Sequence, residues 1–195
     1  MRLKLRVRGT IGLRLPNAFR ILTGCDDRNR AAEYSLYFVR RADEIMIPWT
    51  RLYSEVPATL KALRQGGVRV AIISSKFRYR IAAIREKSRL LGEVDVIVGG
   101  ENVREHKPHP EGLHYALNQL RVDASHSVYV GDHPLDAEAA ARADLAFVAV
   151  RTGQSRPDTW MVLAPLGVVD NVSGLLRLVE CPVPQSREVP TDGGN

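Results

Sequence analysis

Two carboxylates four residues apart, Asp132 and Asp136, follow directly after a short apolar run that ends in Gly131. Pro134 then opens an alanine-rich stretch, so the pattern predicts a strand, a tight turn and a helix. In a parallel α/β sheet such a turn lies at the carboxyl end of a strand, where ligands bind. Two carboxylates beside exposed helix amides suit a hard cation such as Mg²⁺, together with substrate phosphate oxygens. The alternative is an ordinary helix start whose acidic residues complement the helix dipole.

Polar side chains also follow other predicted strands. Ser74 and Ser75 come after the apolar run that ends at Ile73, where a hydroxyl and the next amides can hydrogen-bond a phosphate oxygen. Lys107 precedes Pro108 in a stiffened loop, where an ammonium can act as a point charge on a phosphate and on an attacking carboxylate. Alone, Ser74 is more often a helix cap and Lys107 a solvated loop residue. Their occurrence at successive strand ends makes the combination far more specific.

The elements that must position these residues alternate regularly from about residue 54. Apolar strand-like runs are expected at 68–73, 94–98, 127–130, 145–150 and 167–169, and helices at 57–64, 79–91, 110–120, 134–143, 157–163 and 171–179. The run 68–73 is nearly continuous in apolar character, as in a strand buried on both faces. This alternation predicts a doubly wound, mostly parallel α/β domain.

The two ends of the chain are expected to differ from this core. Residues 2–8 alternate between basic and apolar side chains, which predicts a half-exposed strand. Residues 13–49 predict a small helical cap insert with a break at about residue 24. The α/β core then consists of 1–12 and 50–180, and 181–195, with few apolar residues, is expected to be a disordered tail.

Composition narrows the class of function. With 195 residues, 45% of them hydrophobic, the chain is long enough for one core. The net charge is +6, but Lys and Arg are scattered beyond the first eight residues, which argues against a nucleic-acid partner. An anionic small-molecule substrate or a merely basic surface would account for the excess of positive charge. Cys25 and Cys181 lack metal-like spacing and are expected as reduced thiols in a cytoplasm; no run predicts a signal peptide or a membrane span. The oligomeric state is left open.

Together these segments resemble the haloacid dehalogenase superfamily of phosphohydrolases, in particular its phosphoglycolate-phosphatase-like members, over about residues 54–154. The run 71–76 is similar to the second motif of the family, Lys107-Pro108 to the third, and Gly131-Asp132 with Asp136 to the fourth. The resemblance implies a Rossmann-like core with a small cap, Mg²⁺ as the cofactor and a small phosphorylated metabolite as the substrate.

The same resemblance implies roles for individual residues. Ser74 would grip the phosphate, with Ser75 beside it, and Lys107 would stabilise both the nucleophile and the phosphate. Asp132 and Asp136 would position the metal. His133 lies between these two acids and could touch a substrate.

The first motif of the family is changed in this chain. In the family a buried strand ends Asp-x-Asp-Gly-Thr, with the first Asp as nucleophile and metal ligand and the second as general acid and base. Here Arg6 and Arg8 occupy these two positions, before Gly9-Thr10. A guanidinium stays protonated, so it can be neither a nucleophile nor a proton shuttle. The resemblance thus predicts an impaired or inactive phosphatase scaffold with weak Mg²⁺ binding. The alternative is a non-catalytic pseudoenzyme that binds a phosphorylated ligand or a protein partner.

Three explanations of this change remain open. The chain is a true pseudoenzyme, or residues 1–15 are decoded in the wrong reading frame, or the strand lies on a sheet edge and the alignment is wrong. Burying several unpaired charges costs several kcal/mol each. A central place for this strand would therefore require displacement or unusual charge pairing.

Overall fold

The computed structural model describes residues 7, 10, 13, 15–90, 92–153 and 164–179. The helices in these ranges are α2 (Leu15–Thr23), α3 (Arg28–Trp49), α4 (Val56–Gln65), α5 (Arg78–Lys87), α6 (Glu111–Leu120), α7 (Pro134–Arg142) and α9 (Leu175–Val179). The strands are β1 (Ala71–Ile73), β2 (Val96–Val98), β3 (Val128–Gly131), β4 (Ala146–Val150) and β5 (Gly167–Val169). Their order along the chain confirms the predicted alternation, except that residues 157–163 lie outside the described ranges.

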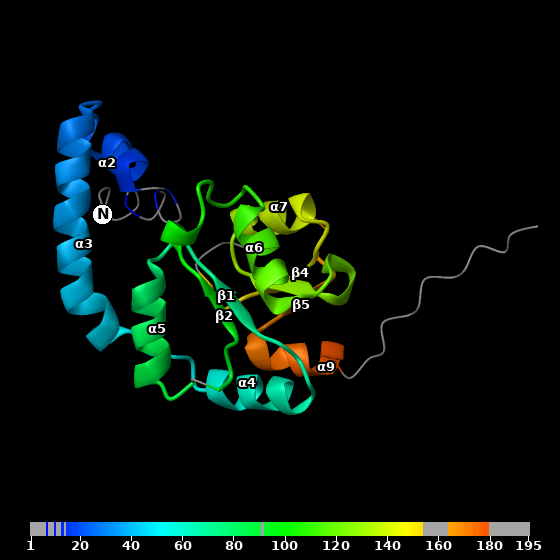
Figure 1. Cartoon of the computed structure of the whole chain (residues 1–195). Coiled ribbons are helices and arrows are strands. Elements are labelled where there is room, and N and C mark those ends of the chain that lie inside the picture. Colours follow the sequence, from blue (N-terminus) through cyan, green and yellow to red (C-terminus); the bar gives the residue numbers. More distant parts are fainter. Residues whose placement is uncertain are drawn as a thin grey trace, which may run out of the picture.

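The strands pair in parallel and form two sheets, one of two strands and one of three (Figure 1). β1 pairs with β2, with Ile72 opposite Ile97. β4 lies between β3 and β5, so that Val148 is opposite both Val130 and Gly167. Within the described ranges no strand joins β1 to β3. The predicted doubly wound, mostly parallel α/β class is thus confirmed.

β1 is shorter and less buried than the sequence predicts for residues 68–73. It has three residues, and all of them are half-buried. Before the strand, the Val70 amide donates to Oδ2 of Asp95 at 2.7 Å, where a regular ladder would have a carbonyl acceptor. The lower burial follows because β1 has one neighbouring strand in the described part of the chain.

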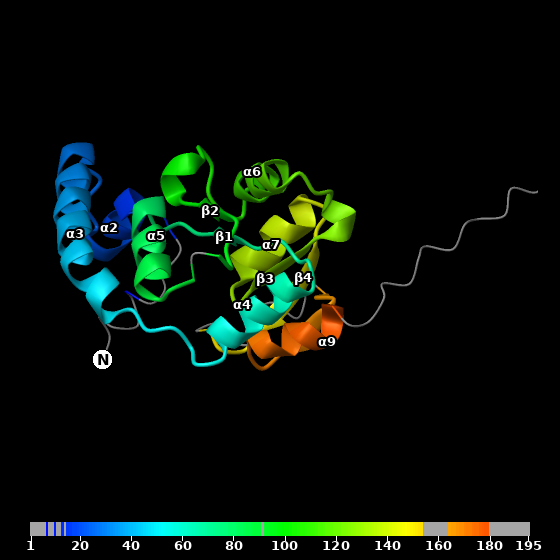
Figure 2. The same ribbon diagram turned by 60° about the horizontal axis from the view of Figure 1, so that its bottom comes forward.

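Helices cover the strands on both sides, and α4 and α9 lie side by side across the strands from α6 (Figures 1 and 2). α6 contacts β1 and β2, whereas α7 contacts β3 and β4. The buried alanines of α7, Ala137, Ala139 and Ala140, let this helix approach closely. They pack with Tyr129 and Phe147 in the larger of the two hydrophobic clusters that the described residues form.

The amino-terminal helices α2 and α3 form a hairpin beside α5 (Figures 1 and 2). Asp27 caps α3, because its Oδ1 accepts hydrogen bonds from two amides of the first turn at 2.8 and 3.3 Å. The ring of Phe19 on α2 lies 5.7 Å from Tyr34 and 6.1 Å from Phe38 on α3. The two predicted helical pieces are therefore present, and their role as a cap stays a prediction. No described helix is long and apolar enough to cross a membrane.

The strand predicted for residues 2–8 is wrong at Val7. Val7 is helical and 44% exposed. Its carbonyl accepts hydrogen bonds from the amide and the hydroxyl of Thr10, at 3.1 and 2.8 Å, which is a local turn and not a strand ladder. The physical reason is that a strand needs a neighbouring strand for its backbone hydrogen bonds, whereas the carbonyl of Val7 is bonded within its own segment. Arg6, Arg8 and the predicted tail 181–195 lie outside the described residues.

Candidate active site

A cavity of about 810 Å³ opens at the carboxyl ends of β1, β2 and β3. Small-molecule sites have volumes of about 300–1,000 Å³. The residues that the sequence predicts to contact phosphate or metal all lie on its wall: Ser74, Ser75, Lys107, Asp132, His133 and Asp136. They follow the carboxyl ends of strands in both sheets, which is where ligands bind in α/β proteins, and the cavity lies between these strand ends.

Ser74 extends the ladder beyond β1, since its amide donates to the carbonyl of Val98 at 3.0 Å. Its hydroxyl accepts a hydrogen bond from the Lys76 amide at 3.2 Å, in the kind of turn that serine side chains form. The Gly100 amide donates to the carbonyl of Lys76 at 2.9 Å and ties this loop to the one after β2. The hydroxyls of Ser74 and Ser75 are thus presented by a backbone that two loops hold in place.

The start of α5 is held by Glu101 and leaves no space beside Gly99. The Arg78 amide donates to both carboxylate oxygens of Glu101, at 2.8 and 3.0 Å. This satisfies one of the amides that a helix start leaves without a helical partner. A Cβ atom on Gly99 would lie 2.3 Å from the Arg78 nitrogen and 2.7 Å from its Cα.

Gly99→Ala is expected to lower the free energy of unfolding by about 2–3 kcal/mol, because the added methyl group meets backbone that Glu101 holds. Urea unfolding followed by circular dichroism measures this loss. Gly92→Ala is the matched control, since a Cβ there meets nothing within 4 Å. Equal effects of the two substitutions would mean that the loops after β1 and β2 move apart easily.

Lys107 reaches the cavity from a loop that Glu111 shapes. The carboxylate of Glu111 accepts hydrogen bonds from the amides of Arg104 and Glu105, at 3.0 and 2.9 Å. These bonds, with that of Arg104 the larger influence, lower the pKa of Glu111. The peptide bond between Lys107 and Pro108 is cis. The loop that the sequence predicts to be stiffened by proline is therefore also tied to the first turn of α6.

Lys107, Tyr129 and Asp136 form a closed triangle of hydrogen bonds. Lys107 Nζ donates to Asp136 Oδ1 at 2.5 Å and to the Tyr129 hydroxyl at 3.1 Å, and this hydroxyl donates to the same Oδ1 at 3.2 Å. Burial by itself would lower the pKa of Lys107, but Tyr129 and Asp136 outweigh it and raise that pKa. Burial raises the pKa of Tyr129 to about 12, with Lys107 opposing and Asp136 adding to the shift. At neutral pH the wall thus carries an ammonium and a neutral phenol.

The other oxygen of Asp136 holds the turn before α7. Asp136 Oδ2 accepts hydrogen bonds from the amides of Asp132 and His133, at 3.3 and 3.1 Å. His133 in turn caps α7, because its Nδ1 accepts from the Leu135 amide at 3.1 Å. This bond assigns the proton of the neutral imidazole to Nε2, on the opposite edge of the ring. His133 therefore keeps an N–H donor in addition to its capping role.

Two glycines make room for the two carboxylates. A Cβ atom on Gly131 would lie 2.6 Å from the Cβ of Asp136. A Cβ atom on Gly153 would lie 1.9 Å from Oδ2 of Asp132. Each carboxylate therefore occupies the space that a side chain at the neighbouring glycine would fill.

The described residues fit Mg²⁺ only in part. Both oxygens of Asp136 accept hydrogen bonds from protein donors, so this carboxylate would have to exchange them to bind a metal. Asp132 is the other carboxylate of the pair. Mg²⁺ usually takes one or two carboxylates together with substrate phosphate oxygens and waters. No group of three or more His, Cys, Asp or Glu residues within the described ranges could hold a metal. By themselves these residues do not fit a tightly held Mg²⁺ ion.

Tyr129 is the residue of this site that the sequence prediction missed. Its side chain is 8% exposed, whereas the preceding Val128 is 49% exposed. The sequence did contain a signal for it. Alternate residues of a strand point to the same face, so Tyr129 shares a face of β3 with Gly131. A strand tyrosine that is buried needs a partner for its hydroxyl, and the adjacent acid pair was the obvious candidate.

A parallel α/β core that presents serine, lysine and an acid pair at successive strand ends defines a class of proteins, the haloacid dehalogenase-like hydrolases. The model of that family matches residues 4–150, a range that includes Arg6 and Arg8, and the chain belongs to this family. Within the family it is phosphoglycolate-phosphatase-like, as its similarity to curated proteins shows.

Two curated relatives are phosphoglycolate phosphatases. The plasmid protein of Cupriavidus necator is 34% identical over 128 residues, which cover 66% of this chain and 55% of the relative. That of Pseudomonas fluorescens is 30% identical over 177 residues, which cover 88% of this chain and 64% of the relative. The chain thus spans between about half and two thirds of the length of these relatives.

Solved structures have the same fold. A haloacid dehalogenase-like hydrolase from Bacteroides fragilis is 32% identical, with a TM-score of 0.83 over 87% of this chain and 81% of that chain. A predicted phosphoglycolate phosphatase from Haemophilus somnus is 20% identical, with a TM-score of 0.78 over 91% of this chain and 82% of that chain. At the lower identity the likeness concerns the fold alone.

Proposed function

We propose that this chain binds a small phosphomonoester and that its ability to hydrolyse it is impaired or absent. One observation carries the proposal: Ser74, Lys107 and Asp132 line a single cavity whose wall holds a half-buried, paired ammonium. A fixed ammonium beside hydroxyl donors suits a phosphate oxygen, because charge-assisted hydrogen bonds are about twice as strong as neutral ones. The named activity of the relatives supports a small phosphorylated metabolite as the ligand.

The roles of the cavity residues follow from their donors. Ser74 and Ser75 offer hydroxyls, Lys107 an ammonium and His133 the Nε2 N–H to the phosphate oxygens. Asp132 lies beside this position and, with Asp136, is the candidate metal-ligand pair. Because Asp136 already accepts four hydrogen bonds, we expect Mg²⁺ to bind weakly in the native chain.

Impaired hydrolysis follows from the arginines at positions 6 and 8 of the sequence. These positions correspond to the nucleophile and the general acid and base of the family. An arginine supplies neither function, and loss of a nucleophile lowers turnover by about a million-fold in a serine protease.

The reduced state expected for Cys25 and Cys181 supports a cytoplasmic location.

The double substitution Arg6→Asp, Arg8→Asp is expected to raise the Mg²⁺-dependent hydrolysis of an aryl phosphate by on the order of a thousandfold, because it supplies the two carboxylates that the family uses as nucleophile and metal ligand and as general acid and base. Hydrolysis is measured with and without Mg²⁺ on the native chain and on the variant. Arg2→Asp with Lys4→Asp is the matched control, since it changes the charge of the same segment equally and is expected to leave turnover at the native level.

The outcomes separate the proposal from its alternative. Turnover by the native chain with Mg²⁺ would show that Arg6 and Arg8 do not occupy the catalytic positions, and it would overturn the proposed impairment. If neither chain turns over but the native chain binds inorganic phosphate, the protein is a pseudoenzyme that binds a phosphorylated ligand. If the native chain binds no phosphate and the variant remains inert, the proposed ligand class is wrong.

A further inference from the structure

Lys107 has a long and flexible side chain, yet two acceptors hold its ammonium. Nζ donates to Asp136 Oδ1 at 2.5 Å and to the Tyr129 hydroxyl at 3.1 Å. An ammonium has three N–H donors and no acceptor. Within the part of the chain that the structure describes, these two are its hydrogen-bond acceptors. One N–H therefore remains for a ligand in the cavity that Lys107 lines.

The direction of each hydrogen bond around Tyr129 follows from the chemistry of its neighbours. An ammonium cannot accept and an ionised carboxylate cannot donate. The Tyr129 hydroxyl therefore accepts from Lys107 and donates to Asp136 Oδ1, which is 3.2 Å away. A single carboxylate oxygen would fix how far the ammonium lies from Asp136. A second acceptor also fixes the direction of the N–H that is left over.

Tyr129 is a rigid reference for this lysine. It lies on β3 opposite Phe147 of β4, and the centroids of the two rings are 6.4 Å apart. Its side chain is 8% exposed and belongs to the cluster that packs under α7. Strand pairing and close packing leave such a side chain little freedom, whereas a lysine has a flexible four-carbon stem.

From this geometry we propose that Tyr129 is a positioning residue, which acts through Lys107 and aims the remaining N–H of its ammonium at an anionic oxygen in the cavity. The inference rests on the proposed function in taking that oxygen to be part of a phosphate. The contact between Tyr129 and Lys107 exists without any ligand. Tyr129 itself makes no bond to the phosphate in this arrangement.

A double-mutant cycle between Tyr129→Phe and Lys107→Met, with inorganic phosphate as the probe, tests the proposal. Tyr129→Phe alone is expected to raise the Kd for phosphate about fivefold to tenfold, the net worth of one hydrogen bond. In the Lys107→Met background it is expected to change Kd by less than about twofold, since no ammonium is left to orient. Unchanged binding in the native background, or an equal loss in both backgrounds, would overturn the proposal.

A control and a measurement without ligand keep the inference separate from the proposed function. Phe147→Leu disturbs the packing beside Tyr129 but keeps the hydroxyl, so it is expected to lower stability and to leave Kd within about twofold. The four proteins of the cycle are also unfolded in urea without phosphate, with an expected coupling of about fivefold in the folding equilibrium constant. If the native chain binds no phosphate, the proposed function fails. If the two substitutions also change the free energy of unfolding additively, Tyr129 does not hold Lys107, and the inference fails as well.

Discussion

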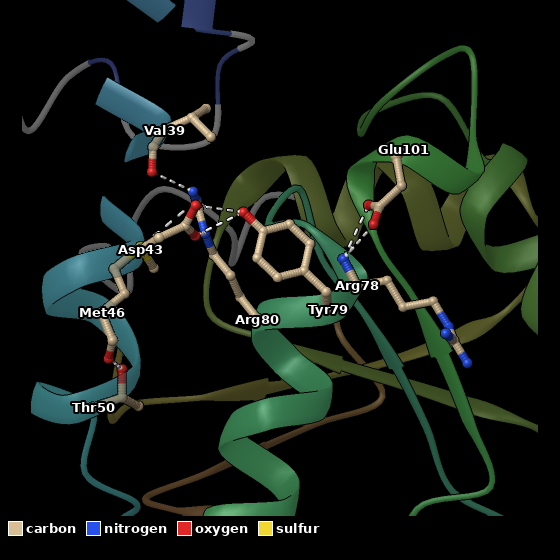
Figure 3. A network of polar contacts seen from close by, with 8 residues as sticks. All are labelled: Val39, Asp43, Met46, Thr50, Arg78, Tyr79, Arg80 and Glu101. Atoms are coloured by element: carbon tan, nitrogen blue, oxygen red, sulfur yellow. Dashed lines mark hydrogen bonds and ion pairs between the residues drawn. The ribbon is translucent and has the colours of Figure 1, made fainter. Parts of the chain in front are cut away.

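Asp43→Ala is expected to lower the free energy of unfolding by about 3 kcal/mol, because it leaves a buried guanidinium without its carboxylate. Arg80 on α5 is 3% exposed, and its Nε donates to Asp43 Oδ1 on α3 at 2.5 Å (Figure 3). Its Nη2 also donates to the carbonyl of Val39 at 2.8 Å. The Tyr79 hydroxyl donates to the same carboxylate, at 2.7 and 2.9 Å to its two oxygens.

Glu44→Ala is the control for this substitution. Glu44 is the next residue of α3, and its ion pair with Arg41 is exposed on both sides, so a change of at most about 0.5 kcal/mol is expected. Urea unfolding gives the stability, and proteolysis of the segment between α3 and α4 reports whether the hairpin separates from α5. Equal effects of Asp43→Ala and Glu44→Ala would mean that solvent or another group takes the place of Asp43.

The same contact has a defined pH dependence. The hydrogen bonds from Arg80 and then from Tyr79 lower the pKa of Asp43. A carboxyl whose pKa is lower in the folded protein stabilises it above its unfolded pKa, about 3.9, and this stabilisation is lost as the pH falls through the folded value. The difference in stability between the native protein and Asp43→Asn should therefore shrink below pH ~4. A difference that is constant from pH ~7 to ~3 would contradict this assignment.

Lys107→Met is expected to raise the Kd for inorganic phosphate about 50-fold, because a hydrogen bond to a charged group is worth about 1.5–3 kcal/mol. The substitution also leaves Asp136, which is 5% exposed, without its counterion, so stability should fall as well. Isothermal titration calorimetry measures the affinity, and urea unfolding measures the stability of the same protein.

Lys76→Met is the matched control, since it removes the same charge from the wall of the same cavity. Lys76 is exposed and pairs with no acid in the described ranges, so its loss is expected to change Kd by less than about threefold. Equal losses from the two substitutions would show that the cavity attracts phosphate through its overall charge. The ammonium of Lys107 would then contribute no more to phosphate binding than any other positive charge on the wall.

Much of this site was predictable from residues that lie far apart in the sequence. Ser74, Lys107 and Asp132 each follow or precede a predicted element at the carboxyl end of a strand, and topology then brings them together. Tyr129 was missed because a strand tyrosine has no distinctive spacing. Its importance depends on which face of β3 meets α7, and the position of that helix depends on tertiary packing.

The remaining differences have physical causes of the same kind. The pairing of Asp43 with Arg80 joins residues 37 apart in the sequence, and it depends on how the hairpin of α2 and α3 sits against α5. The alternation of residues 2–8 predicted a strand, yet Val7 is helical. A period-two pattern indicates a strand only where a neighbouring strand and a buried face are available, because most of the stability of a strand comes from its partners.

The recess at this site is shaped by backbone more than by reactive groups. Gly131 and Gly153 leave the spaces that the carboxylates of Asp136 and Asp132 fill, and Gly99 leaves space for the start of α5. An alanine at any one of these glycines would force a carboxylate or the start of α5 to shift. The space open to a ligand therefore depends on three positions that carry no side chain.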